Sequence, residues 1–476
     1  MTDDDLCFLN AVELARLVRE RAISPVELID AHLARIEALN PKINAATEIL
    51  TVSARETAKG AEQAVLRGDP LAPLHGVPFS TKDAIALAGV PSARGSRLLV
   101  GQAPDRDATV VTRMKQAGAI PLIKTNIPEF SLWWETDNLV HGRTNNPWDL
   151  DRTPGGSSGG ESAAIAAGMS PLGLGSDVGI SVRGPAMFTG IVALKPTHGR
   201  IPLTGHWPQA LARWWHIGPM ARSIADVSVA LDLLSGPDGE DGYAIHAPAP
   251  RLSDLPPSAR PLRVGWMAER GFGPMDDEVV ATVARAAEAI AKEGHVIEPV
   301  QLAILEQTDW TEPAITLWST QTPPYLAPLV EGRLNELSPV GARQIGRVRP
   351  SADHYAAAEW AVERLRCAFA GYFSRYDALL CPVIPFPAPK HGEKAYSVKG
   401  QEIATTQIMR ATVPFNLTGL PALSVPFGFN GDGLPLGVQV VTKWLDEATA
   451  LRLGLALERA NSSRLLRPPV KSRPLD

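Results

Sequence analysis

The chain has 476 residues, of which 45% are hydrophobic and 20% are charged, and its formal net charge is −5 at pH 7. This composition excludes a disordered polypeptide, because the chain carries enough apolar side chains to form a large core. It also argues against nucleic acid or an acidic membrane as the main partner, since no excess of basic residues is present.

The sequence also bears on the cellular compartment. The three cysteines, Cys7, Cys367 and Cys381, show no CxxC spacing, which excludes a disulfide scaffold and fits a reducing compartment. The first residues are acidic, whereas a secretory signal begins with basic and then apolar residues. No run approaches the ~18 apolar residues of a membrane span. We therefore expect a soluble, cytoplasmic protein.

The first predicted element is a helix that begins near Ser24. Ser24 and Glu27 have the spacing of a capping box, and Pro25 occupies the first helical position. The apolar residues that follow recur at three- and four-residue steps and predict one buried face: Val26, Ile29, Leu33 and Ile36. Pro41 is expected to end this helix.

Strands and helices alternate in the next part of the chain. Residues 74–83 predict a short strand that runs into a turn, residues 110–118 a helix, and residues 119–124 a buried strand. We interpret two glycine-rich stretches, residues 154–160 and 173–184, as turns on either side of a short helix of small residues. Because so many glycines are costly in backbone entropy, we expect this region to serve a functional site.

The second half of the chain repeats the alternation. Residues 236–261 are rich in Pro, Gly, Asp and Ser and predict a long surface connection. The elements expected after it are a strand at 262–266, a helix at 277–293, a strand from 296, helices within 301–375, strands at 378–383, 422–427 and 437–441, and a helix at 447–460. The whole pattern predicts an α/β protein.

The stretch 155–160, Gly-Gly-Ser-Ser-Gly-Gly, fits more than one motif. It is not a phosphate-binding P-loop, because Glu161 stands where that loop requires lysine. A dinucleotide fingerprint that starts at Gly173 lacks its third glycine. An esterase of the α/β-hydrolase type, with Ser158 as nucleophile, stays open as an alternative. The loop-like character of residues 144–153 and the lack of a distinctive histidine count against it.

Several segments together resemble the amidase signature family. They occur in the family's order: His-Gly-Val-Pro-Phe-Ser-Thr-Lys-Asp at 75–83, Lys-Thr-Asn-Ile-Pro-Glu-Phe at 124–130, the stretch 155–160, Pro-Leu-Gly-Leu-Gly-Ser-Asp at 171–177, Ser-Val-Arg-Gly-Pro at 181–185, Gly-Ile-Val-Ala-Leu-Lys-Pro-Thr at 190–197, Phe-Asn-Leu-Thr-Gly-Leu-Pro-Ala at 415–422 and Pro-Leu-Gly-Val-Gln at 435–439. The resemblance implies one large α/β/α domain, residues 1–476, with a mixed, twisted central sheet covered by helices on both faces. Residues 70–200 would form its signature core and residues 301–375 a variable helical cover on the substrate side.

The resemblance also implies roles for particular residues of a serine amidase. Lys82 would be the base, Ser157 the bridging serine on a cis peptide, and Ser181, 24 residues after Ser157, the nucleophile. The oxyanion hole would consist of backbone N–H groups just before and at the nucleophile: Val178, Gly179, Ile180 and Ser181. Ile180 replaces a glycine of the family, so the turn either adopts a conformation that a branched residue tolerates or is strained.

Three further residues are expected to support the site structurally: Ser158, Asp177 and Arg183. Asp177 and Arg183 form either a plain ion pair or a pair with a direct role at the site. The ten histidines show no HExxH or comparable spacing, so we expect neither a metal ion nor another cofactor.

The predicted residue types suit amide hydrolysis. A serine hydroxyl is a weak nucleophile and needs a neighbouring base. A lysine amine can be that base when burial disfavours its charged form. A hydroxyl both donates and accepts, so Ser157 can pass a proton from Ser181 to Lys82.

The substrate prediction depends on tryptophan, of which the chain has eleven. Trp133, Trp134, Trp214 and Trp215 occupy segments that line the substrate pocket in the family. We therefore expect an apolar or aromatic pocket for a small-molecule amide, anilide or hydrazide with an aryl or long acyl group. The alternative is that at least half of these rings belong to the core.

Two other functions stay open. The chain could be the glutamine-hydrolysing component of a tRNA-dependent amidotransferase, or a binding protein without catalytic activity. The segment at 126–130 and the two tryptophans after it favour a hydrolase. For assembly, general precedent alone predicts a homodimer.

Overall fold

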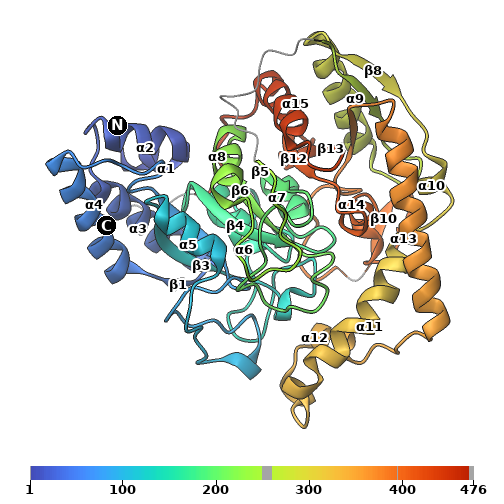
Figure 1. The fold of residues 1–476 in the computed structure, drawn as a ribbon, viewed down its shortest axis with the longest axis horizontal. Helices are drawn as coiled ribbons and strands as arrows, with labels where there is room; N and C mark the ends of the chain where they lie inside the picture. Colours follow the sequence, from blue (N-terminus) through green and yellow to red (C-terminus); the bar gives the residue numbers. More distant parts are fainter. Residues whose placement is uncertain (1, 249–259, 394, 471–476) are drawn as a thin grey trace.

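A mixed β-sheet runs through the middle of the molecule (Figure 1). The computed structural model describes residues 2–248, 260–393 and 395–470. Within these ranges the sheet has eleven strands in the order β1-β3-β2-β4-β6-β5-β12-β13-β9-β7-β8, and β10 and β11 form a separate two-stranded sheet. The bounds are β1 Ala46–Ile49, β2 Pro78–Lys82, β3 Ile120–Thr125, β4 Leu172–Asp177, β5 Val192–Lys195, β6 His216–Ala221, β7 Arg263–Trp266, β8 Val296–Pro299, β9 Ala378–Pro382, β10 Tyr396–Val398, β11 Gln401–Ile403, β12 Ala422–Phe429 and β13 Pro435–Thr442.

The sheet combines both pairing directions. β2 pairs in parallel with β3 and β4, and β7 pairs in parallel with β8 and β9. The pairs from β4 through β6, β5, β12 and β13 to β9 are antiparallel. Strand β2, which ends at Lys82, is therefore an inner strand, and every one of its residues is buried.

Helices cover both faces of this sheet. Their bounds are α1 Asp3–Phe8, α2 Ala11–Arg19, α3 Pro25–Ile43, α4 Thr51–Arg67, α5 Thr109–Gln116, α6 Gly159–Ala166, α7 Arg183–Thr189, α8 Ile224–Leu234, α9 Asp277–Lys292, α10 Ala303–Glu306, α11 Thr311–Val330, α12 Pro339–Ile345, α13 Ala352–Phe373, α14 Val413–Leu417 and α15 Glu447–Ala460. On β9, Ala378 and Leu380 join the core beneath α8 and α15, whereas Leu379 and Cys381 join a second core with α11, α13 and α14. Successive side chains of a strand point to opposite faces. The predicted α/β class, with a mixed sheet between helices, is confirmed.

The N-terminal part agrees with its prediction except at one residue. The capping box of Ser24 and Glu27 is present, with Pro25 in the first turn of α3. The prediction that Pro41 ends this helix is wrong, because the helix continues to Ile43 with Pro41 inside it. Pro41 removes only the hydrogen bond of its own N–H, and the Asn44 N–H still donates to the Asn40 carbonyl at the end of the helix. The helix stops at Asn44, which adopts the left-handed conformation with φ 55°.

The second glycine-rich stretch is partly a strand and not a turn. Gly173 and Gly175 lie within β4, and neither has a positive φ. A Cβ atom on Gly173 would collide with the Glu161 carboxylate, and one on Gly175 would lie 2.6 Å from the sulfur of Met220. These glycines therefore allow α6 and β6 to approach the strand closely. In the sequence alone, glycines needed for close packing cannot be told from glycines of a turn.

The predicted surface connection is described only in part. Residues 236–248 form neither helix nor strand, and Asp238 and Asp241 tie them to the body by accepting hydrogen bonds from Thr109 and Leu203. Residues 249–259 of that prediction lie outside the described residues. None of the helices in the described ranges combines the length and apolarity needed to cross a membrane.

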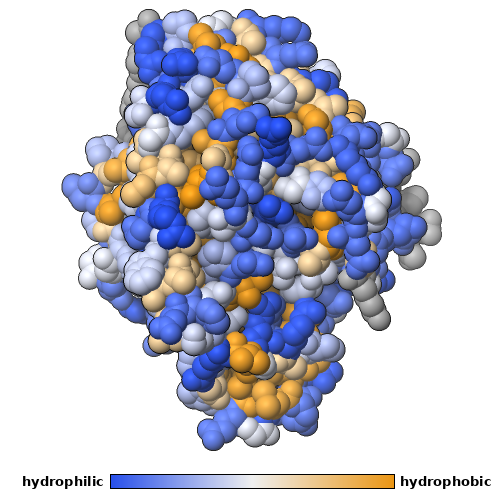
Figure 2. Space-filling view, turned by 90° about the vertical axis from the view of Figure 1, so that its right-hand side faces the viewer, coloured by the Kyte–Doolittle hydropathy of each residue, from blue (hydrophilic) through white to orange (hydrophobic). Residues whose placement is uncertain are grey.

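Residues 301–375 are mainly helical, as predicted, and comprise α10 to α13. These helices lie at one end of the molecule (Figure 1). The face that they present is mainly hydrophilic, with apolar side chains in separate patches (Figure 2).

Candidate active site

Lys82 lies at the end of β2 with no exposed surface. Its Nζ atom is 2.7 Å from Ser157 Oγ, 3.0 Å from Ser176 Oγ and 3.2 Å from the Ser176 carbonyl oxygen. Burial lowers the pKa of Lys82 to about 7, although the charges of Asp177 and Glu161 oppose this shift. A large fraction of the amine is therefore neutral at neutral pH and able to accept a proton.

The two serines before α6 have different surroundings. The Gly156–Ser157 peptide bond is cis, as the family resemblance implies. Ser158 is fully buried, and its Oγ atom lies 3.3 Å from both the nitrogen and the oxygen of the Ser176 backbone. A nucleophile must present its hydroxyl to substrate. The environment of Ser158 therefore disfavours the α/β-hydrolase alternative.

Residues 178–181 form a turn between β4 and α7. Ile180 does not have a positive φ, so the branched side chain causes no backbone strain in this turn. The Ser158 N–H donates to the Ser181 carbonyl over 3.2 Å, which places the two serine-containing turns against each other. Ser181 is only 4% exposed, and it lines a pocket.

A buried ion pair holds both ends of this turn. Arg183 donates to both carboxylate oxygens of Asp177, at 3.0 and 3.1 Å, and to the Gly179 carbonyl at 3.3 Å. Asn416 of α14 donates to Asp177 over 2.9 Å. Burial raises the pKa of Asp177, but the Arg183 guanidinium and hydrogen bonds from Val182 and Asn416 outweigh it and lower the value to about 2. The pair is therefore fully ionised, and its hydrogen bonds to the backbone hold the conformation of the turn.

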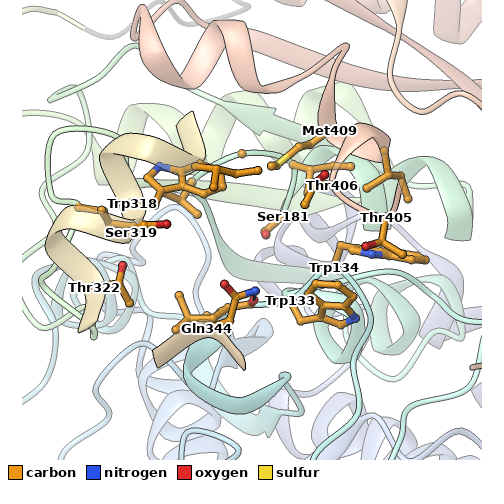
Figure 3. A pocket seen from close by; sticks show the side chains of 18 of the residues that line it. Trp133, Trp134, Ser181, Trp318, Ser319, Thr322, Gln344, Thr405, Thr406 and Met409 are labelled. Carbon is orange, nitrogen blue, oxygen red and sulfur yellow. Dashed lines mark hydrogen bonds between the residues drawn. The ribbon is translucent and has the colours of Figure 1, made fainter. Parts of the chain in front are cut away.

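The pocket next to Ser181 encloses about 750 Å³, counting its mouth to solvent. Figure 3 shows Ser181 between Trp318 of α11 on one side and Trp133 and Trp134 on the other. The remaining walls consist of Ser131, Leu132, Val178, Gly179, Ile180, Leu211, Ile315, Ser319, Thr322, Gln344, Arg347, Thr405, Thr406, Ile408 and Met409. No carboxylate occurs among these residues of the described chain, and Arg347 is their one charged side chain.

The structure separates the four predicted substrate tryptophans into two pairs. Trp133 and Trp134 line the pocket, whereas Trp214 and Trp215 do not. The prediction for the second pair is wrong, because both rings are buried, at 0% and 1% exposure, in the core beside α11 and α13. Trp215 instead packs against a histidine behind Lys82, with its ring centre 4.7 Å from that of His206.

A buried carboxylate, Glu129, holds the start of helix α12. Glu129, in the predicted family segment at 124–130, accepts hydrogen bonds from Ser96 at 2.7 Å and from the hydroxyl and N–H of Ser338 at 2.6 and 2.8 Å. Ser338 is the N-cap of α12. The position of α12, which carries Gln344 into the pocket, therefore depends on a residue of the signature core.

Several site residues were missed by sequence reasoning. Asn416 and Glu129 lie in recognised family segments, so those segments were the available signal. Trp318 and Met409 come from parts of the chain without a motif, and no local pattern distinguishes them from core residues. Ser176 also lies in a recognised family segment, but its contact with Lys82 depends on the adjacent strands β2 and β4.

Comparison with known proteins decides the family. The family model named Amidase matches residues 27–451. The chain belongs to the amidase signature family. It is 36% identical to a glutamyl-tRNA(Gln) amidotransferase component of Moorella thermoacetica, over 98% of this chain and 99% of that protein. It is 33% identical to an acylamidase of Rhodococcus erythropolis, over 100% of this chain and 99% of that protein.

A solved structure supports the same assignment. The substrate complex of 6-aminohexanoate cyclic dimer hydrolase has a TM-score of 0.87 and 30% identity, and covers 98% of this chain and 99% of that chain. Amidase signature enzymes hydrolyse amide C–N bonds, so this member is an amidohydrolase. The predicted family and enzyme class are confirmed.

Proposed function

We propose that this amidase signature enzyme hydrolyses apolar or aryl amides, anilides or hydrazides through an acyl-enzyme on Ser181, with Ser157 and Lys82 as the proton relay. The observation that supports this most is the buried Lys82 amine, 2.7 Å from Ser157 Oγ, in a chain whose Ser181 lines a largely apolar pocket.

Two other buried lysines of the described chain have surroundings that do not suit a base. Lys195 donates only to the backbone carbonyls of Pro196 and Leu420. Lys124 contacts a serine hydroxyl, but it also forms an ion pair with Asp83 at 3.0 Å, which favours its charged form. Lys82 has a serine hydroxyl as partner without such an ion pair.

The mechanism follows from the chemistry of these groups. Ser181 Oγ attacks the substrate carbonyl carbon while its proton moves to Ser157, and the proton of Ser157 moves to Lys82. Backbone N–H groups of residues 178–181 stabilise the oxyanion, an effect of very roughly 3–4 kcal/mol per donor. The proton returns from Lys82 through Ser157 to the leaving amine as the C–N bond breaks. Water then attacks the acyl-enzyme by the same relay.

The alternative function is glutamine hydrolysis within an amidotransferase, which the 36% identity to a component of such an enzyme favours. Free glutamine carries an ammonium group that needs an anionic partner. The described pocket walls hold hydroxyls, aromatic rings and one guanidinium but no carboxylate. The described pocket walls therefore offer no anionic partner for the ammonium group of glutamine, which favours a substrate without an amino group.

A substrate panel tests the proposal directly. The purified chain alone is expected to hydrolyse an acyl anilide and an aryl hydrazide, and to leave glutamine intact. Release of aniline, hydrazine or ammonia is measured for each substrate. Glutamine hydrolysis that requires an added partner protein would instead establish the amidotransferase role.

The pH dependence of kcat/KM is expected to show an acid limb near pH 7. Burial lowers the pKa of Lys82 to about 7, and only its neutral amine accepts a proton, so activity rises with pH through this range. Burial also raises the pKa of Glu161 to about 7, so both groups titrate together. In Glu161→Gln the limb should move to lower pH. The negative charge of Glu161 stabilises the ammonium form of Lys82, so its removal lowers the pKa of the amine further. A limb above about pH 9, near the value for free lysine, would contradict this prediction.

The pocket assignment predicts that Trp318 affects substrate binding, whereas Trp214 affects the stability of the fold. Trp318→Ala is expected to raise KM for an aryl amide by roughly 3- to 10-fold, since it removes about 0.5–1.5 kcal/mol of aromatic contact. Trp214→Ala is expected to destabilise the fold by about 3–5 kcal/mol, because it opens a cavity in the core. Trp360, which is 66% exposed, provides a control whose replacement changes neither quantity. KM and the free energy of unfolding are measured for all three variants.

A further inference from the structure

We infer that His206, through Ser176, is a positioning residue that directs the lone pair of the Lys82 amine toward Ser157. This inference depends on the proposed role of Lys82 as base. Ser176 Oγ lies between the two side chains, 3.0 Å from Lys82 Nζ and 2.9 Å from His206 Nε2. All three residues are buried, with exposures of at most 3%.

The direction of the hydrogen bonds decides whether Lys82 can act as a base. A neutral amine has two N–H groups and one lone pair, and Lys82 Nζ has three oxygen neighbours: Ser157 Oγ, Ser176 Oγ and the Ser176 carbonyl. The carbonyl can only accept, so it takes one N–H. If the Ser176 hydroxyl also accepts, the lone pair is left for the proton of Ser157. If that hydroxyl donates instead, the lone pair is used by Ser176 and Lys82 cannot receive a proton from Ser157.

His206 selects the first arrangement. Burial and the nearby charges of Lys82 and Arg94 lower the pKa of His206 to about 3, so its ring is neutral and has one N–H. Nε2 is the ring nitrogen that faces Ser176 Oγ, over 2.9 Å. We assign the proton to Nδ1, which leaves Nε2 as an acceptor. Ser176 therefore donates to His206, and its oxygen remains free to accept from Lys82.

The surrounding fold holds His206 in this position. Residues 84–86 come after Lys82 and Asp83, and they bond to the loop of His206: the Trp207 N–H donates to the Ala84 carbonyl over 2.9 Å, and the Ala86 N–H donates to the Gly205 carbonyl over 3.0 Å. The Trp215 ring packs next to both side chains: its centre lies 4.7 Å from the centre of the His206 ring and 5.9 Å from Lys82 Nζ. The charged or titratable groups that act on Lys82 from other elements are Glu161 of α6 and Asp177 of β4.

Replacement of His206 tests this inference. His206→Leu removes the acceptor, so the Ser176 hydroxyl can donate to Lys82. We expect kcat to fall by about 10- to 100-fold with KM within twofold, and the acid limb to move to lower pH because the neutral amine gains a donor. His206→Gln can place an amide oxygen near the former Nε2 position and is expected to restore most of the activity. Nitrogen-15 NMR of histidine-labelled enzyme should show that Nε2 of His206 carries no proton.

Substitutions of Ser176 distinguish a loss of positioning from a folding defect. Ser176→Ala removes the hydroxyl that would donate to Lys82, so combining it with His206→Leu should restore most of kcat, whereas Ser176→Thr alone retains the hydroxyl and should keep the limb at its original pH. Wild-type kcat and an unmoved limb in His206→Leu, or no recovery of kcat in the double variant of a protein that is still folded, would overturn the inference. Full activity of Lys82→Met would overturn the proposed function itself, so the two failures are distinguishable.

A different observation concerns the recognition of charge in the pocket. Arg347 lines the pocket and, in the described parts of the chain, has neither an ion pair nor a hydrogen bond; its pKa is lowered by burial and by the neighbouring Arg343. Arg343 stacks on Trp133, with its guanidinium 4.4 Å from the ring centre, and it also has no ion pair within the described residues. An unpaired, partly buried guanidinium beside a pocket without carboxylates favours an anionic ligand.

We propose that Arg347 binds a carboxylate carried by the substrate at a distance from the scissile amide. This deepens the proposed function, because it restricts the apolar amides to those with an acidic substituent. The fixed position of α12, which ends two residues earlier at Ile345 and is anchored by Glu129, supports a defined subsite.

A matched pair of anilides, with and without a para-carboxylate, tests this subsite. Wild type is expected to prefer the carboxylate by about tenfold or more in kcat/KM, and Arg347→Gln to abolish that preference. Arg349→Gln, at an exposed position two residues further on, is the control and should keep the wild-type ratio. An unchanged ratio in Arg347→Gln, or no preference in wild type, would overturn the subsite while leaving amide hydrolysis itself intact.

Discussion

Alanine in place of Ser181 is expected to lower kcat by at least ~10⁴-fold and to prevent formation of the acyl-enzyme. The reason is that no hydroxyl remains at the pocket wall to attack the substrate carbonyl. The backbone N–H groups of the 178–181 turn stay in place, so a small residual activity above water is expected. Turnover of an aryl amide is measured together with mass spectrometry of enzyme treated with a fluorophosphonate.

Ser158→Ala is the matched comparison for this experiment. Its hydroxyl is fully buried against the Ser176 backbone, so its loss should leave labelling at Ser181 detectable. Labelling that persists in Ser181→Ala and disappears in Ser158→Ala would favour the α/β-hydrolase alternative. An enzyme that is neither labelled nor active on amides, esters or hydrazides would favour a binding protein without catalytic activity.

Methionine in place of Lys82 is expected to lower kcat by about 10²- to 10⁴-fold and to remove the acid limb near pH 7. The substitution keeps an unbranched side chain of similar length but has no lone pair able to accept the proton of Ser157. Substrate binding does not involve this buried residue, so KM is expected to stay within about threefold. The pH profile of kcat/KM and the melting temperature are measured for both proteins.

Lys195 supplies the control for this substitution. It is also fully buried, and burial lowers its pKa, but its amine donates only to the carbonyls of Pro196 and Leu420. Lys195→Met is expected to retain the acid limb near pH 7, whatever its effect on the melting temperature. If both variants lose activity in proportion to lost stability, Lys82 has no special role as base.

Local sequence was sufficient for features that depend on short-range chemistry. The capping box at Ser24 and the alternation of strands and helices are set by residues a few positions apart. The family segments predicted the amidase signature family and the α/β class. The comparisons confirm the family, and the fold confirms the class. The roles predicted for Lys82, Ser157 and Ser181 rest on those same segments and await the experiments above.

The errors arose where a local signal has more than one physical cause. Pro41 suggested a helix end, but the proline removes only the hydrogen bond of its own N–H, and the helix continues to Ile43. Gly173 suggested a turn, but it lies in β4, where glycine is needed because the Glu161 carboxylate occupies the space that a Cβ would take. Neither distinction is visible until the neighbouring element is in place.

The sequence by itself determined the family, the fold class and the candidate relay, because these depend on motifs of consecutive residues. Only the tertiary structure decided which rings face the pocket, since Trp134 and Trp214 have equally apolar side chains and differ only in what packs around them. It also decided the partners of Lys82: His206 lies 124 positions away in the sequence and approaches the amine through Ser176 because its loop pairs with the residues that follow β2. Contacts between distant segments depend on packing of the whole chain, which no local pattern encodes.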